Sequence, residues 1–179
     1  MLSDIEVRDL ARRMSVPLVF CSFKDNLARE TLQYNKSYVV NMESTTDPET
    51  GKKNEGSHYV CFQCNRYPSG EKQCIYFDSY GMPPPQEIID FCAPVKVHWN
   101  TKDIQSLMAD CCGYFCLAFL HFVNACPQRT GHLFADSEQF TCLFEDLNKS
   151  NDHKKNEYIL KHFFRSSDPA KRKDIEVGF

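Results

Sequence analysis

The feature that most constrains the fold is an apolar segment from Cys111 to Ala125. Phe115, Phe119 and Phe122 fall on one side of a helix drawn through it, and leucines fill much of the rest. A helix that is apolar on most of its surface has to be buried on most sides. The segment is shorter than the roughly 20 apolar residues that cross a bilayer. It therefore predicts a buried central helix around which the other elements pack, and no membrane association.

Two segments upstream are rich in β-branched and aromatic residues, at 58–64 (HYVCFQC) and 73–78 (QCIYFD). Such residues are typical of strands, and the NRYPSGEK sequence between the two segments is a good turn. Together they predict an antiparallel hairpin. Other patterns predict strands at 38–42 and 95–99 and helices at 3–14, at 86–91, from about Asp136, and at 156–164.

These elements indicate an α+β fold with a small, mostly antiparallel sheet packed with helices. The 179 residues fit one domain. Neither an internal repeat nor a linker divides the chain, so we expect a single domain over 1–179. Its last segment, 168–179, is polar and is expected to be a flexible tail.

Charge and cysteine content narrow the class of protein. A net charge of −3 argues against a protein whose main function is to bind nucleic acid. The chain has 10 cysteines and no secretory signal segment at its start. This combination favours an intracellular, reducing compartment with mostly free thiols.

The predicted hairpin brings a histidine close to a carboxylate. A turn centred near Pro68 places His58 opposite Asp78. Facing side chains of an antiparallel pair are about 5 Å apart at Cβ, so the carboxylate could orient the imidazole and stabilise its charged form. A surface histidine beside a surface aspartate at a sheet edge is the alternative.

Two cysteines lie where a polar loop enters the buried helix, at Cys111 and Cys112. A thiol at a helix N-terminus meets the positive end of the helix dipole and backbone N–H donors, which favour the reactive thiolate. Gly113 lets a substrate backbone approach. Packing of small side chains at the entry of the helix is the alternative, and it is our interpretation of Cys116.

A glutamine precedes these cysteines. Gln105 lies seven residues before Cys112, and its side-chain amide could donate to a developing oxyanion. The alternative is a solvated glutamine in a loop.

A metal site is suggested by Cys61-x-x-Cys64. Residues three apart on a strand face opposite sides, however, so these two cannot share one ion. We therefore expect no metal and no cofactor. Apart from Cys111 and Cys112, the cysteines are expected to be core or surface thiols: Cys21, Cys61, Cys64, Cys74, Cys92, Cys116, Cys126 and Cys142.

Four motifs then occur in order: Gly56-Ser57-His58-Tyr59, Phe77-Asp78-Ser79-Tyr80-Gly81, Gln105, and Cys112-Gly113-Tyr114-Phe115-Cys116. The series resembles the adenovirus-type cysteine endopeptidases over residues 1–165. The run FDSYGMPPPQEI looks closer still to the adenovirus-like proteases of Polinton/Maverick elements and related DNA viruses of invertebrates. Tyr59 stands where that family commonly has tryptophan, and Cys111 precedes the position of its nucleophile.

The resemblance implies an adenain-like fold, in which the central helix carries the nucleophile at its N-terminus. It also implies roles for individual residues. Cys112 would be the nucleophile, His58 its base, Asp78 the group that orients His58, and Gln105 an oxyanion donor. The flanking residues implied to bind substrate are Gly56, Ser57, Tyr59 and Gly113.

The resemblance further implies protein substrates, namely capsid or core precursors with small residues near the cleaved bond. The adenovirus enzyme is activated by DNA and a peptide, which makes either a partner by analogy. We expect a monomer that acts inside the host cell or in a virion. Two alternatives stay open: an isopeptidase that removes ubiquitin or a ubiquitin-like modifier, and an inactive protease-like binding module.

Overall fold

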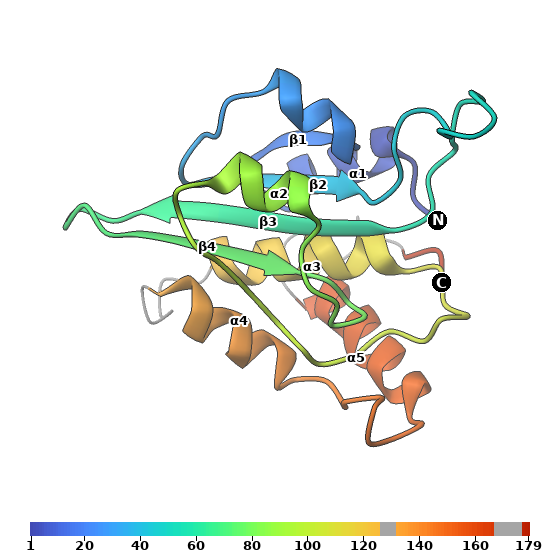
Figure 1. Ribbon diagram of the computed structural model, residues 1–179. Coiled ribbons are helices and arrows are strands. Elements are labelled where there is room, and N and C mark those ends of the chain that lie inside the picture. The colour runs from blue at the N-terminus through green and yellow to red at the C-terminus, as the bar shows by residue number, and fades with distance from the viewer. Residues whose placement is uncertain (126–131, 167–176) are drawn as a thin grey trace.

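The computed structural model describes residues 1–125, 132–166 and 177–179 (Figure 1). Its strands are β1 (Leu18–Phe23), β2 (Lys36–Asn41), β3 (Tyr59–Arg66), β4 (Lys72–Phe77) and β5 (Val97–Trp99). Its helices are α1 (Asp4–Arg13), the 3₁₀ helix η1 (Lys24–Arg29), α2 (Gln86–Cys92), α3 (Cys112–Ala125), α4 (Leu133–Thr141) and α5 (His153–Ser166). The predicted α+β class is confirmed.

The strands form one five-stranded sheet in chain order, from β1 to β5. The two central pairings, β2 with β3 and β3 with β4, are antiparallel. The two outer pairings, β1 with β2 and β4 with β5, are parallel. Parallel neighbours need a crossover, and η1 and α2 provide these crossovers. The sheet is therefore mixed, with an antiparallel centre.

The hairpin of β3 and β4 forms as predicted, but its register differs by two residues. Cys61 lies opposite Phe77, and Cys64 lies opposite Cys74. Continued beyond the strand ends, this register places His58 opposite Tyr80 rather than opposite Asp78. The cause is the position of the turn: Tyr67 and Glu71 close it, so it is centred on Ser69 instead of Pro68, and each facing partner moves by two residues.

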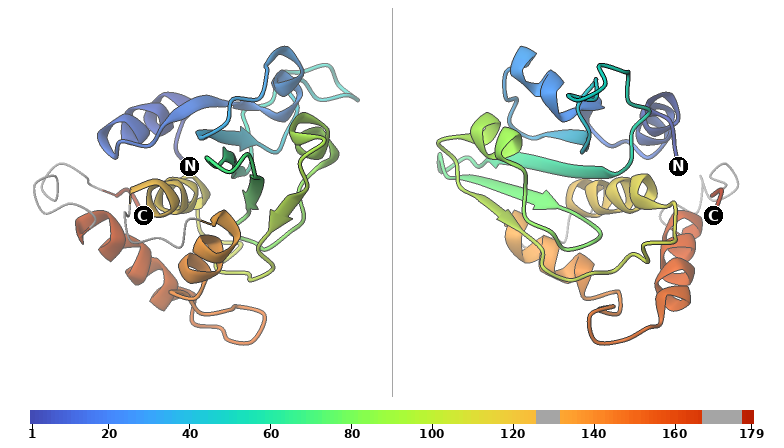
Figure 2. Two further views of the ribbon diagram at one scale, coloured as in Figure 1. Left: turned by 90° about the vertical axis from the view of Figure 1, so that its left-hand side faces the viewer. Right: turned by 45° about the vertical axis from the view of Figure 1, so that its right-hand side comes forward.

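Helix α3 covers one face of the sheet and is buried as its sequence predicts (Figure 2). Phe115 and Phe119 are fully buried, and the Phe119 ring stacks on Phe77 with the centroids 4.6 Å apart. Side chains of α1, α4 and α5 complete this core. Residues of η1 and α2 join a second core on the other face of the sheet. The sheet and α3 together provide the frame on which the site residues are held.

Two further expectations concern the C-terminal half. Helix α4 begins at Leu133, before Asp136, and ends at Thr141. Of the segment expected to be a flexible tail, residues 177–179 are described, and there the Gly178 N–H donates to the Tyr114 hydroxyl at 3.0 Å. Cys126 lies outside the described residues.

None of the described helices has the length and apolar character needed to cross a membrane.

Candidate active site

Three segments distant in sequence meet at one end of the sheet. His58 directly precedes β3, Asp78 directly follows β4, and Cys112 is the first residue of α3. All three side chains are largely or fully buried. The structure therefore brings together the histidine, carboxylate and thiol that the sequence singles out.

His58 and Asp78 form a short ion pair, with 2.7 Å between His58 Nε2 and Asp78 Oδ1. Because of the register, this contact is diagonal across the two strands, which is within reach of long side chains. Burial by itself lowers the pKa of His58, but the interactions with Asp78 and then with the nearby Cys112 outweigh it and raise the pKa to about 9. The imidazole is therefore a cation at neutral pH.

The backbone of Asp78 is held by a side chain that we did not predict as part of the site. Asn100 Oδ1 accepts from the Asp78 N–H at 3.1 Å, and Asn100 Nδ2 donates to the Asp78 carbonyl at 2.8 Å. Asn100 directly follows β5, whose parallel pairing with β4 brings it there. No local sequence signal could have indicated this contact.

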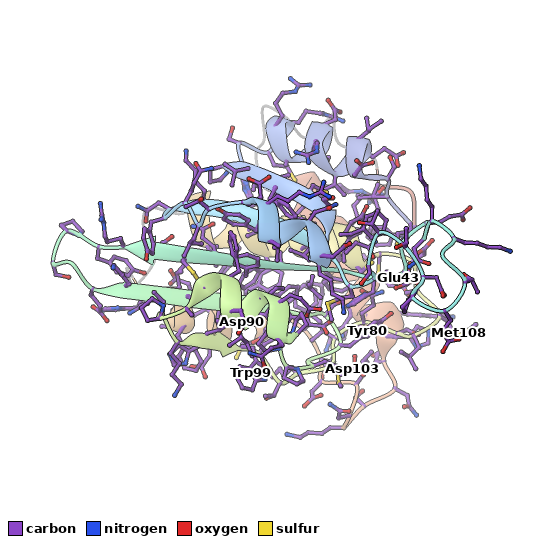
Figure 3. All side chains as sticks on the ribbon, turned by 45° about the horizontal axis from the view of Figure 1, so that its top comes forward. Glu43, Tyr80, Asp90, Trp99, Asp103 and Met108 are labelled. Atoms are coloured by element: carbon purple, nitrogen blue, oxygen red, sulfur yellow. A yellow bond between two sulfur atoms is a disulfide. The ribbon has the colours of Figure 1, made fainter. Side chains whose placement is uncertain are left out.

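Tyr80 is a second unpredicted site residue. Its N–H donates to Asp78 Oδ1 at 2.9 Å, and its ring stacks on His58 with the centroids 4.4 Å apart. It lies on the same side of the molecule as Glu43 and Met108 (Figure 3). An aspartate that accepts from the N–H two residues on makes a common turn, so the Asp78-Ser79-Tyr80-Gly81 sequence did carry a signal for it.

That turn depends on a glycine. Gly81 has a φ of +72°, a conformation that glycine adopts without strain. A Cβ there would also lie 2.7 Å from the backbone of Thr101 and of Lys102. The chain after Asp78 can therefore pass this close to the segment after β5 only with glycine at this position.

Cys112 lies at the N-terminus of α3, as expected, where the helix dipole favours a negative charge. Its Sγ accepts from the Tyr59 N–H at 3.4 Å, which also favours the thiolate. His58 Nδ1 is buried and makes no hydrogen bond to any of the described residues. Since Nε2 is bound to Asp78, Nδ1 is the ring atom left to exchange a proton with the thiol.

Cys111 differs from Cys112 although the two are adjacent. Its side chain is fully buried. Burial, followed by the nearby Glu157, raises the pKa of Cys111 to about 12. Cys111 is therefore a neutral thiol at physiological pH, whereas Cys112 faces the imidazolium of His58.

Gln105 is buried beside the site rather than solvated. Its Oε1 accepts from the Ser79 hydroxyl at 2.7 Å, and its Nε2 donates to the Ala109 carbonyl at 2.8 Å. A longer contact of 3.4 Å runs from the same Nε2 to the Tyr80 hydroxyl. Gln105 thus joins the loop after β4 to the loop before Cys112. Of the two hydrogen bonds that its Nε2 donates, the one to Tyr80 is the weaker.

The residues expected to bind substrate surround this centre. Tyr59 is buried against α3, where its carbonyl accepts from Cys116 Sγ at 3.4 Å. The Gly56 N–H donates to Glu43, and the Ser57 N–H donates to Asn41. These bonds fix the chain that leads to His58.

Gly113 is covered on one side by the N-terminal segment. A Cβ at Gly113 would lie 3.3 Å from Leu2 Cδ1 and 3.4 Å from Tyr59 Cδ2. The close approach that the glycine was expected to offer a substrate is made here by Leu2.

A group of three cysteines lies away from this centre. As expected, Cys61 and Cys64 belong to different cores. Cys64 and Cys74, however, form a disulfide across β3 and β4, so they are not the free thiols that we expected. The two-residue change of register sets them directly opposite each other. Cys92 Sγ lies 3.4 Å from Cys74 Sγ.

Comparisons with known proteins give low similarity. No protein-family model matches the sequence, and no curated protein is significantly similar to it. Among solved structures, the fold is similar to HopZ1a, crystallised in complex with IP6, with a TM-score of 0.43 and 12% identity over 68% of this chain and 42% of that chain. It is also similar to the ASFV pS273R protease, with a TM-score of 0.42 and 16% identity over 76% of this chain and 67% of that chain. The chain therefore spans less than half of HopZ1a.

Proposed function

We propose that the chain is a cysteine peptidase in which Cys112 is the nucleophile. The observation that carries the proposal is the ion pair of His58 with Asp78 beside a thiol at a helix N-terminus. An imidazole held by a carboxylate and facing a thiol is the arrangement that activates a cysteine nucleophile. All the positions this chemistry needs are filled, which argues against an inactive binding module.

In the proposed resting state, His58 Nδ1 already holds the proton of Cys112, so that the two side chains form a thiolate–imidazolium pair. The thiolate attacks the carbonyl carbon of a peptide bond, and the negative charge passes to the carbonyl oxygen. His58 then returns the proton to the leaving amine as the C–N bond breaks. His58, now neutral, takes a proton from water, which hydrolyses the thioester and restores the thiolate–imidazolium pair.

Two groups are proposed to stabilise the oxyanion: the backbone N–H of Cys112 and the side-chain amide of Gln105. The Cys112 N–H belongs to the first turn of α3, where backbone N–H groups have no partner within the helix. Asp78 keeps Nδ1 directed at the thiol because it occupies Nε2.

The proposed substrates are proteins, and the motif resemblance favours capsid or core precursors with small residues near the cleaved bond. DNA or a peptide is proposed as activator on the same ground. The proposed setting is the interior of a host cell or a virion, with the enzyme acting as a monomer.

Because Cys111 and Cys112 are adjacent, variants of the two cysteines test the proposed nucleophile against a matched control. Cys112→Ala is expected to abolish cleavage of a peptide library, and Cys111→Ala is expected to keep most of the activity because its thiol is not at the histidine. His58→Ala should be nearly as damaging as Cys112→Ala. Circular dichroism of each variant checks the fold. Loss of activity in Cys111→Ala with activity retained in Cys112→Ala would identify a different nucleophile.

A further inference from the structure

A three-cysteine cluster, made of Cys64, Cys74 and Cys92, lies on the face of the sheet opposite α3. Cys64 and Cys74 face each other on β3 and β4, and Cys92 ends α2, the helix that carries the labelled Asp90 (Figure 3). The three sulfur atoms lie within 4.8 Å of one another. Each residue is at most 1% exposed. The sulfur atoms of β3, β4 and α2 therefore meet at one buried position.

The spacing of the sulfur atoms suits a shared metal ion. Zinc binds thiolate sulfur at about 2.3 Å, which places two sulfur ligands of one tetrahedral ion roughly 4 Å apart. Among the described residues, the cluster contains neither a carboxylate nor an imidazole. Ligands that are all thiolates select soft ions over magnesium or calcium.

The Cys64–Cys74 disulfide has to be opened before these sulfurs can bind an ion. A phosphine reductant supplies two electrons, and water supplies the two protons of the new thiols and the oxygen of the resulting phosphine oxide. A dithiol reductant supplies both electrons and both protons and becomes a disulfide. The ion then displaces a proton from each of the three thiols.

We propose that the reduced chain binds one divalent thiophilic ion of the zinc class through Cys64, Cys74 and Cys92. A divalent ion leaves a net charge of −1 with three thiolates, whereas a monovalent ion would leave −2. The divalent ion is favoured because the neighbours are apolar, among them Phe62 and Ile88, and burial of charge is costly there. The bound ion would tie α2 to the hairpin.

The test uses cadmium as the probe, since the ¹¹³Cd chemical shift depends on the number of sulfur ligands. The full chain carries Cys112→Ala, because the nucleophile is itself thiophilic, and it is reduced with a phosphine. We expect one equivalent of Cd²⁺ to remain bound after desalting, with a shift typical of three sulfur ligands. The melting temperature should rise with Cd²⁺ concentration, because a ligand of the folded state stabilises it.

Two cluster variants and one matched control locate the ion. Cys92→Ser and Cys64→Ala are each expected to weaken Cd²⁺ binding by at least about tenfold, since even loss of an outer-shell partner costs that much. Cys21→Ser, which changes an equally buried thiol on β1, should leave the affinity unchanged. The proposal is overturned if the reduced, folded protein retains no Cd²⁺, or if both cluster variants bind it as tightly as the control. Because none of these measurements uses catalysis, they are independent of the proposed peptidase activity.

Discussion

At the scale of single residues, the site depends on how His58 is held. Asp78 binds one ring nitrogen and Tyr80 stacks on the ring, while Asn100 fixes the backbone of Asp78. These contacts leave the imidazole one orientation, with Nδ1 toward Cys112. The histidine is thereby kept charged, and its charge should be visible in titration.

The first prediction concerns the pH range over which His58 is charged. The pKa of His58 is raised to about 9 in the folded chain, above the 6.5 of an exposed histidine. Its contribution to stability is therefore complete below pH 6.5 and is lost as the pH rises through about 9. NMR titration of the His58 ring should show a midpoint near 9, and Asp78→Asn should move it lower. An unchanged midpoint in Asp78→Asn would contradict the role of the carboxylate.

The second prediction concerns Gln105. Gln105→Ala removes an amide donor beside the site, so kcat should fall by roughly 10²-fold, as for loss of one oxyanion donor elsewhere. The side chain also joins two loops, so some stability should be lost too. Alkylation of Cys112 by iodoacetamide separates the two effects, because it needs the thiolate but no oxyanion donor. A wild-type kcat in the variant would remove the catalytic role.

At the scale of elements, helix α3 links the hydrophobic core to the proposed active site. Its first residue is Cys112, and its buried face holds it against β3 and β4. The helix could be predicted because its apolar character is local in sequence, and the same is true of the hairpin. Strand β1 and the sheet order could not be predicted, since parallel pairing depends on tertiary contacts rather than on local pattern.

The site shows the same division between local and tertiary information. His58, Asp78 and Cys112 could be found from motifs and a hairpin turn. Their contact nevertheless depends on a strand register that differs by two residues from the predicted one, and the same difference explains why the pairing of Cys64 with Cys74 could not be predicted. Asn100 enters from β5 through a parallel pairing.

The third prediction tests the anchoring of α3. Phe119 is fully buried and stacks on Phe77, so Phe119→Ala should reduce the free energy of unfolding by about 3–5 kcal/mol. Phe134→Ala is the matched control, because that ring is 43% exposed, and it should cost about 1 kcal/mol or less. Urea denaturation followed by circular dichroism measures both. Equal losses would mean that α3 is not the centre of the core.

At the scale of the whole molecule, the sheet separates the two proposed sites. The proposed active site lies at one end of the α3 core, and the three-cysteine cluster lies in the core on the other face of the sheet. Metal binding at the proposed cluster can therefore change the stability of the fold without any ligand entering the proposed active site.

The fourth prediction concerns the class of substrate. The motifs resemble viral endopeptidases more than proteases of ubiquitin-like modifiers, so the chain should cleave library peptides beside small residues. It should leave propargyl probes of ubiquitin and ubiquitin-like proteins unreacted. Mass spectrometry of the protein after incubation reads out both. Covalent capture of a probe at Cys112 would identify an isopeptidase instead.

If His58 and Asp78 activate Cys112, the effect should be visible in the alkylation rate of each cysteine at pH 6. Peptide mapping after brief exposure to iodoacetamide compares Cys112 with Cys142, an exposed free thiol in the same chain. We predict that Cys112 reacts much faster than Cys142 in the wild-type protein and loses this advantage in His58→Ala. Reaction of Cys112 no faster than Cys142, or an advantage that survives His58→Ala, would mean that His58 and Asp78 do not activate Cys112.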